Sequence, residues 1–297
     1  MKPVIVVDLG GTNLRIARVV GNNVEHREIF STPRGAESIV GLIAEQAMKL
    51  SAGTAVGVAV AAPGAVSRGL GGLSKAPNLP ELDGYPMAEE IRRLSGLHCM
   101  VENDANAYAV GEVTYGAAIG YKSVVVITLG TGIGGGIVLE GRLWRGADGV
   151  AAEIGHVCIE ENGRRCGCGA SGCAEAYGSA SSMLRLAKEY GSNATSAREA
   201  YELAKNGEQA ALKAFKRAGT ALGILISSLV NILNPQAVVI GGGGSAAYDL
   251  LEPYILEEMK LRTFPLAMRN LQLLRCKLKN YAALLGAAVL LEEQIST

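Results

Sequence analysis

Residues 4–12 read Val4-Ile5-Val6-Val7-Asp8-Leu9-Gly10-Gly11-Thr12, an apolar run that ends in an acid, two glycines and a hydroxyl. A short apolar run bounded by glycine predicts a buried strand that leads into a tight turn. The same order returns at residues 123–136, where an apolar run leads into Gly130-Thr131-Gly132-Ile133-Gly134-Gly135-Gly136. We therefore predict two similarly built α/β halves.

The rest of the chain provides further predicted strands and helices for both halves. Apolar alternation predicts strands at 15–19, 24–30, 56–60, 99–102, 137–139, 237–240 and 271–277. Helical spacing predicts helices at 36–50, 87–94, 105–115, 181–190, 196–205, 208–233, 248–260 and 282–294. We expect a smaller N-terminal domain at 1–115, a larger C-terminal domain at 116–281, and a closing helix at 282–297 that packs back on the first domain.

Composition excludes several classes of protein. The 297 residues carry 28 basic and 28 acidic side chains, so the net charge of zero gives no basic surface for nucleic acid. The stretch 218–248 is uncharged, but Asn231, Asn234 and Pro235 interrupt it, so we expect a buried helix and strand instead of a membrane span. No secretory signal is visible, and the six cysteines fit reduced thiols, which together predict a cytoplasmic protein.

A cysteine-rich segment predicts a metal site. Between His156 and Cys173, three thiols follow one imidazole with the spacing Cys-x-Cys-x4-Cys at Cys166, Cys168 and Cys173. Zn(II) prefers four nitrogen and sulfur ligands, and the intervening glycines let a loop wrap around it. A disulfide is the alternative, but three cysteines beside a histidine suit a metal better. With four protein ligands, such a zinc would be structural.

The two glycine-rich loops predict an anion site. Glycines allow backbone N–H groups to approach a phosphate closely, and Asp8 is placed to hold Mg(II) through water. An ordinary hairpin turn is the alternative for either loop alone. Neither loop has the Gly-Lys-Ser/Thr of a Walker motif, and the second leads back into a strand instead of the helix that a dinucleotide site needs.

Acidic residues mark the remaining candidate positions. The run Glu102-Asn103-Asp104 lies where a strand meets a helix, so one carboxylate there is a candidate general base, and a helix N-cap is the alternative role. Glu153 and Glu175 flank the cysteine loop, and they are either ligands of vicinal hydroxyls or solvated acids. The glycines 241–244 offer a platform for a purine or simply a turn into a helix.

Together these motifs resemble the ROK family of sugar kinases within the actin-like ATPase superfamily. The motifs that carry the resemblance are Asp8-x-Gly-Gly-Thr, Glu102-Asn-Asp-Ala-Asn-Ala, Leu129-Gly-Thr-Gly-x-Gly-Gly-Gly, Glu153-x-Gly-His and Cys166-x-Cys-Gly-x-x-Gly-Cys-x-Glu. The resemblance implies two ribonuclease-H-like domains that flank a cleft and close over a sugar and MgATP. It also implies a homodimer or homotetramer.

The resemblance also implies roles for individual residues. Asp104 would be the general base on the sugar 6-hydroxyl, and Asn103, Glu153, His156 and Glu175 would bind the other hydroxyls. The phosphates would bind to Asp8 through Mg(II) and to Gly10, Gly11, Thr12, Thr131, Gly132 and Gly134, with Gly242 and Gly243 beside the adenosine. Zinc would be held by His156, Cys166, Cys168 and Cys173.

We therefore expect an ATP-dependent hexose kinase with glucose as substrate. The same motifs would also suit a kinase for fructose, mannose, allose or an N-acetylhexosamine, and Ser67, where family glucokinases often have Asp, bears on that choice of sugar. A non-catalytic sugar sensor and a chaperone-type ATPase are the competing hypotheses outside the sugar kinases. Repressors of this family carry a DNA-binding domain ahead of the first phosphate motif, and we expect none here because Asp8 is the eighth residue.

Overall fold

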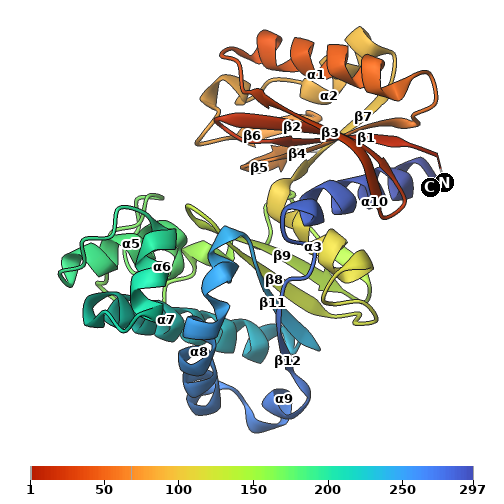
Figure 1. Cartoon of the computed structure of the whole chain (residues 1–297). Helices are drawn as coiled ribbons and strands as arrows, with labels where there is room; N and C mark the ends of the chain where they lie inside the picture. The colour runs from red at the N-terminus through yellow and green to blue at the C-terminus, as the bar shows by residue number, and fades with distance from the viewer. Residues whose placement is uncertain (1, 68, 297) are drawn as a thin grey trace. The chain divides into compact units, whose positions relative to one another are not determined.

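Two five-stranded sheets organise the chain (Figure 1), which is described by a computed structural model over residues 2–67 and 69–296. Each sheet belongs to one compact unit. The first unit comprises the residues up to Gly120, Leu143–Ala151 and the residues from Asn280 onward, and the second comprises Tyr121–Arg142 and Ala152–Lys279. The first unit thus includes 143–151, which the sequence pattern places in the C-terminal domain.

The sheet of the first unit has the strand order β3-β2-β1-β4-β7. Its strands are β1 (Val4–Leu9), β2 (Asn13–Val20), β3 (Asn23–Ser31), β4 (Gly57–Ala62) and β7 (His98–Asn103). The first three form an antiparallel meander, whereas β4 and β7 run parallel to β1. The carboxyl ends of β1, β4 and β7 therefore lie at one edge, where ligands of open α/β sheets usually bind.

Helices cover both faces of this first sheet (Figure 1). One face carries α1 (Ala36–Ser51) and α2 (Met87–Ser95), and α10 (Ala282–Ser296) lies on the other and packs closely along α3 (Asp104–Tyr115). A small hairpin of β5 (Ala65–Ser67) and β6 (Gly72–Lys75), followed by the 3-10 turn η1 (Pro80–Leu82), was not predicted from the sequence. The closing helix at the end of the chain is thus part of the first unit.

The second unit repeats the strand arrangement of the first. Its sheet has the order β10-β9-β8-β11-β12, with β8 (Val124–Leu129), β9 (Ile133–Leu139), β10 (Arg142–Trp144), β11 (Ala237–Gly241) and β12 (Gln272–Arg275). As in the first sheet, the central strand β8 pairs antiparallel with the strand that follows it and parallel with β11. The predicted α/β fold with two similarly built halves is confirmed.

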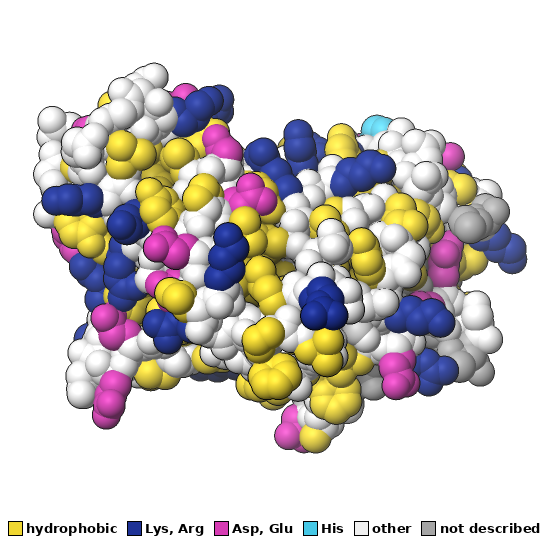
Figure 2. Space-filling view, turned by 90° about the horizontal axis from the view of Figure 1, so that it is seen from below, with side chains coloured by type: hydrophobic (Ala, Val, Ile, Leu, Met, Phe, Trp, Pro, Cys, Tyr) yellow, Lys and Arg dark blue, Asp and Glu magenta, His cyan; other side chains and the backbone are white. Residues whose placement is uncertain are grey.

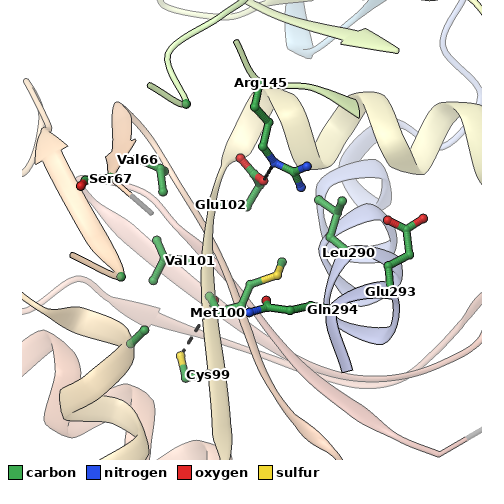
Figure 3. Close-up of a pocket in the computed structure, with 13 residues that line it drawn as sticks. Val66, Ser67, Cys99, Met100, Val101, Glu102, Arg145, Leu290, Glu293 and Gln294 are labelled. Atoms are coloured by element: carbon green, nitrogen blue, oxygen red, sulfur yellow. Dashed lines mark hydrogen bonds and ion pairs between the residues drawn. The ribbon is translucent and has the colours of Figure 1, made fainter. Parts of the chain in front are cut away.

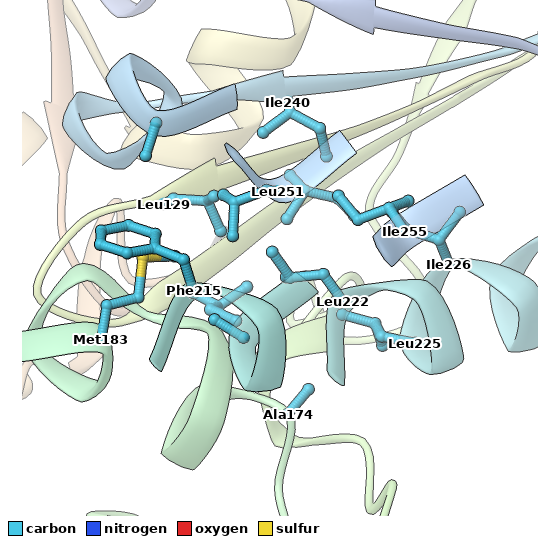
Figure 4. Close-up of a cluster of buried hydrophobic side chains, with 14 of the residues drawn as sticks. Leu129, Ala174, Met183, Phe215, Leu222, Leu225, Ile226, Ile240, Leu251 and Ile255 are labelled. Carbon is cyan, nitrogen blue, oxygen red and sulfur yellow. The ribbon is translucent and has the colours of Figure 1, made fainter. Parts of the chain in front are cut away.

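One helix dominates the core of the second unit. Apolar side chains of α7 (Gln209–Leu233), including Phe215 and Leu222, pack among residues of the sheet and of α8 (Tyr248–Arg262), as Figure 4 shows. The remaining helices are α4 (Glu175–Gly178), α5 (Ala180–Glu189), α6 (Ala197–Lys205) and α9 (Pro265–Asn270), with 3-10 turns η2 (Ile154–His156), η3 (Gly243–Ala247) and η4 (Lys279–Tyr281).

The uncharged stretch 218–248 forms the buried half of α7, then β11 and η3, as predicted. Its apolar character follows from burial in the core, because Leu225, Ile226 and Val239 have no solvent exposure. Across the described residues, we find no helix with the length and hydropathy that crossing a bilayer requires. On the face drawn in Figure 2, basic and acidic side chains are interspersed.

Candidate functional site

Asp8 lies at the carboxyl end of β1, where its carboxylate is paired with Arg15. The two residues are directly opposite each other in the β1–β2 ladder, and Arg15 Nη1 is 2.7 Å from Asp8 Oδ2. The sequence analysis did not identify this ion pair, although hairpin register alone would have placed the two side chains on one face. The Arg15 guanidinium holds the carboxylate at the sheet edge, and the predicted role of Asp8 toward Mg(II) stays a prediction.

The turn after β1 is shaped by close backbone approaches. Gly10 N–H donates to Asn13 O at 2.9 Å, which closes the hairpin. A Cβ added to Gly11 would lie 3.0 Å from Asn78 O, so the neighbouring loop leaves little room for a side chain. Thr12 is exposed beside them. The turn therefore exposes backbone without side chains at Gly10 and Gly11, together with the hydroxyl of Thr12. This surface fits the predicted contact with an anion.

Asn103 and Asp104 form the junction of β7 and α3. Asn103 Oδ1 accepts hydrogen bonds from Ala105 N at 2.9 Å and Asn106 N at 3.0 Å, so Asn103 is the N-cap of α3. Its amide Nδ2 donates to Gly64 O at 3.0 Å. Asp104 is the first residue of the helix and is partly exposed. The N-cap role is confirmed for Asn103, and Asp104 stays the candidate base.

The second glycine-rich loop joins β8 to β9. Glu175 Oε2 accepts a hydrogen bond from Ile133 N at 2.9 Å, and a Cβ on Gly132 would lie 2.3 Å from the same oxygen. Glycine at position 132 is therefore needed for Glu175 to reach the loop. Thr131 is exposed at the tip, and Gly134 lies opposite Thr128 in the ladder.

A third glycine segment lies beside this loop. Gly242 follows β11 with a φ of 73°, a conformation that favours glycine, and a Cβ there would lie 2.5 Å from Leu129 O. Ser245 Oγ donates to Gly242 O at 2.7 Å and fixes the turn. Gly243 is exposed at the start of η3. Two glycine segments of the second unit thus meet at the carboxyl ends of the neighbouring parallel strands β8 and β11.

The predicted metal ligands come together in the second unit. Ligand atoms of His156, Cys166, Cys168 and Cys173 all lie within 4.8 Å of one another. His156 Nδ1 is 3.6 Å from Cys166 Sγ, and Cys168 Sγ is 3.7 Å from Cys173 Sγ. Two thiolates bound tetrahedrally to one zinc at about 2.3 Å would lie roughly 3.8 Å apart, so the donor set fits zinc. All six cysteines are free thiols, which excludes the disulfide alternative.

The surroundings of this cluster support a cation. Burial raises the pKa of Cys166 to about 12, so a bound cation is what would favour its thiolate. The second ring nitrogen of His156, Nε2, lies 4.0 Å from Glu153 Oε2, so a carboxylate is near this imidazole but beyond hydrogen-bond distance. Cys166 Sγ lies 3.5 Å from Glu175 Oε1. Glu175 therefore contacts both the cysteine cluster and the second glycine-rich loop.

Tyr177 anchors the loop that carries the cysteines, and the sequence analysis missed it. Its hydroxyl accepts a hydrogen bond from Arg164 N at 2.6 Å, and the Arg217 guanidinium lies 4.1 Å from its ring centroid. Arg217 also forms an ion pair with Glu160 at 2.8 Å. The Tyr177 hydroxyl and Arg217 lower the pKa of Glu160. No sequence motif predicts such a contact, because the contact joins residues from three separate segments of the chain.

Comparison with known proteins identifies the family of the chain. The family model described as "ROK family" matches residues 4–294. A glucokinase of Thermotoga maritima is 34% identical over 98% of this chain and 98% of its own length. The structure of a ROK family glucokinase from Streptomyces griseus in complex with glucose and AMPPNP is 32% identical, with a TM-score of 0.84 over 97% of this chain and 98% of that one. A ROK hexokinase from Thermus thermophilus is 31% identical, with a TM-score of 0.85 over 99% of both chains.

Proposed function

The chain belongs to the ROK family, and we propose that it is an ATP-dependent hexose kinase that phosphorylates glucose at the 6-hydroxyl. The observation that carries this proposal is the junction of β7 and α3, where a capped helix presents Asp104 at the carboxyl edge of the sheet. Similarity to glucokinases over nearly the whole chain supports glucose as the substrate.

The proposed reaction transfers the γ-phosphoryl group of ATP to the sugar. The sugar O6 forms a bond to the γ-phosphorus, the bond between that phosphorus and the bridging oxygen breaks, and ADP leaves. The O6 proton passes to the carboxylate of Asp104, which acts as general base. Glu153, His156, Glu175 and Asn103 would hold the other hydroxyls and thereby fix O6 for attack.

Backbone groups bind the nucleotide in this proposal. The amides of Gly11 and Thr12 in the first unit and of Thr131 and Gly132 in the second would donate to phosphate oxygens, while the Gly10 and Ile133 amides keep their bonds within the protein. Gly10 and Gly134 would leave the backbone bare beside the phosphates, and Gly242 and Gly243 would lie beside the adenosine. Mg(II), when bound with ATP near Asp8, would neutralise charge on the phosphates. Zinc on the cysteine cluster would stabilise the fold around His156 and Glu175. We place this activity in the cytoplasm, because the free thiols suit a reducing compartment.

The test is turnover on a panel of sugars for the wild type and an Asp104→Asn variant. ADP release would be measured with glucose, fructose, mannose, allose and N-acetylmannosamine. Loss of the base should lower kcat on glucose by about 10²–10⁴-fold. Asp249→Asn is the matched control, since Asp249 is also an acid in the first turn of a helix, and its turnover should match the wild type.

Each result has a separate meaning. Turnover on glucose that is lost only in Asp104→Asn supports both the substrate and the base. Turnover on another sugar keeps the mechanism and changes the substrate. Asp104→Asn within tenfold of the wild type would refute the assignment of the base. No turnover on any sugar would overturn the kinase proposal in favour of a sugar sensor.

A further inference from the structure

Glu102 is a buried carboxylate for which the proposed reaction has no use. It precedes the candidate pair Asn103 and Asp104 in β7 and is 6% exposed. Its Oε1 accepts two hydrogen bonds of 3.0 Å, from Asn103 N and from Asn106 Nδ2. The Asn103 donor is the backbone amide before Asp104 and the Asn106 donor is a side-chain amide two residues after it, so the carboxylate links both sides of the junction of β7 and α3.

Arg145 provides the charge that keeps Glu102 buried. Arg145 Nε donates to Glu102 Oε2 at 2.6 Å, the contact drawn as a dashed line in Figure 3, and the two side chains are only 22% and 7% exposed. Ala151 N–H donates to Arg145 O at 3.1 Å, so the segment 145–151 is closed into a loop. An isolated buried carboxylate is costly, and an ion pair that also receives hydrogen bonds offsets this cost.

A cavity of about 500 Å³ borders this pair. Its lining includes Ser67, Met100, Arg145 and Gln294 as well as Glu102 (Figure 3). Without Arg145, the Glu102 carboxylate would be buried and unpaired. Turning into this cavity to reach water would then lower its free energy. That movement would remove the acceptor from Asn103 N–H and from the Asn106 amide, and the first turn of α3 would loosen.

We propose that the Glu102–Arg145 ion pair is a positioning device for Asp104, and this inference rests on the proposed function. The pair fixes the backbone of the first turn of α3 and therefore the direction of the Asp104 carboxylate. Misplacement of a reacting group by about 1 Å can cost roughly 10²-fold in rate. Glu102 and Arg145 themselves touch neither sugar nor ATP in this scheme.

Steady-state kinetics of Arg145→Gln would test the proposal. We expect kcat to fall about 10–100-fold, while the KM for ATP stays unchanged, because only the orientation of the base is lost. Arg145→Lys, which keeps the charge, should recover part of kcat. Arg262→Gln is the control, since it breaks a 2.7 Å ion pair with Glu258 on α8 and should keep the wild-type kcat.

A double-mutant cycle separates this inference from the proposed function. If Arg145 acts through Asp104, Arg145→Gln should cause no further loss of kcat in an Asp104→Asn background. Asp104→Asn with near wild-type turnover would refute the assignment of Asp104 as the base, whereas a wild type that turns over no sugar would refute the proposed function itself. The positioning inference alone would be overturned if Asp104→Asn loses most of kcat and Arg145→Gln either leaves kcat unchanged or lowers it by the same factor in both backgrounds.

A second variant covers the case in which Arg145→Gln fails to fold. Glu102→Met combined with Arg145→Met leaves no unpaired buried charge, so it should fold, yet it also lacks the acceptor for Asn103 N–H. Its kcat should be as low as that of Arg145→Gln, and a wild-type kcat would refute the inference. The only tryptophan, Trp144, precedes Arg145, so its fluorescence should shift in every variant that releases the 145–151 loop.

Discussion

The crossing of α10 and α3 gives a sharp stability prediction for Gly286→Ala. A Cβ at Gly286 would lie 1.7 Å from Ala107 O and 2.6 Å from Gly111 N, both on the backbone of α3. Backbone cannot rotate away as a side chain does, so the two helices must separate by about 1 Å or more. They pack together along most of their length, so this separation loosens the packing of the whole crossing.

We expect Gly286→Ala to lower the free energy of unfolding of the first unit by about 3 kcal/mol, the upper end of the range for overpacking. For a unit of this size, that corresponds to a fall in Tm of roughly 6–12 °C. Both quantities can be measured by circular dichroism during thermal and urea unfolding. Because α3 begins at Asp104, kcat should fall as well, at temperatures where the variant is still folded.

Gly41→Ala is the matched control with the opposite sign. Gly41 also lies inside a helix of the first unit, α1, but a Cβ there would meet no atom within 4 Å. Replacing a helical glycine in open space should stabilise the protein by about 0.5–1 kcal/mol. If Gly286→Ala were as stable as the wild type or stabilised like Gly41→Ala, the reasoning about close helix contact would be refuted.

Two further predictions concern the metal cluster and the pH dependence of stability. A chelator should remove about one zinc per chain and lower Tm, because structural zinc contributes directly to folding. Cys168→Ser should bind less zinc and have a similarly lowered Tm. An unchanged Tm with no metal released would contradict a structural zinc. The Ala76 N–H and Lys75 lower the pKa of Asp83 below its ordinary value of 3.8. The unfolded chain therefore binds this proton more tightly, so the stabilisation by Asp83 is present above that value and is lost as the pH falls below it. The Tm difference between the wild type and Asp83→Asn should accordingly vanish in acid; a difference that persists unchanged there would show that the carboxylate charge plays no part.

The fold was largely predictable because its signals are local. The runs that end at Leu9 and Leu129 form the central strands of the two sheets, and the turn at Gly21 and Asn22 joins β2 to β3, as the apolar runs and glycines indicated. The short hairpin β5–β6 and the helix α9 were missed, since three to six residues carry too little periodicity.

The sequence predicted the cysteine and histidine cluster and the helix cap, but not the residues that support them. The four ligand positions around Cys166 followed from spacing, and the cap by Asn103 followed from residue type. The partners Arg145 and Tyr177 could not be found in this way. Each contacts side chains distant in sequence, and such contacts depend on the tertiary packing, which no local pattern of residues shows.

The course of the chain also has a consequence for its synthesis. A ribosome synthesises α10 only after the whole second unit. The first unit is therefore the first to be started and the last to have all its residues synthesised. At typical rates of translation, the roughly 160 residues between Gly120 and Asn280 take about 8–30 s. During that interval, the face of the first sheet that α10 later covers, along β1 and β4, is without its partner. The nascent protein therefore offers chaperones, or the α10 of a neighbouring chain, a surface that the finished molecule buries.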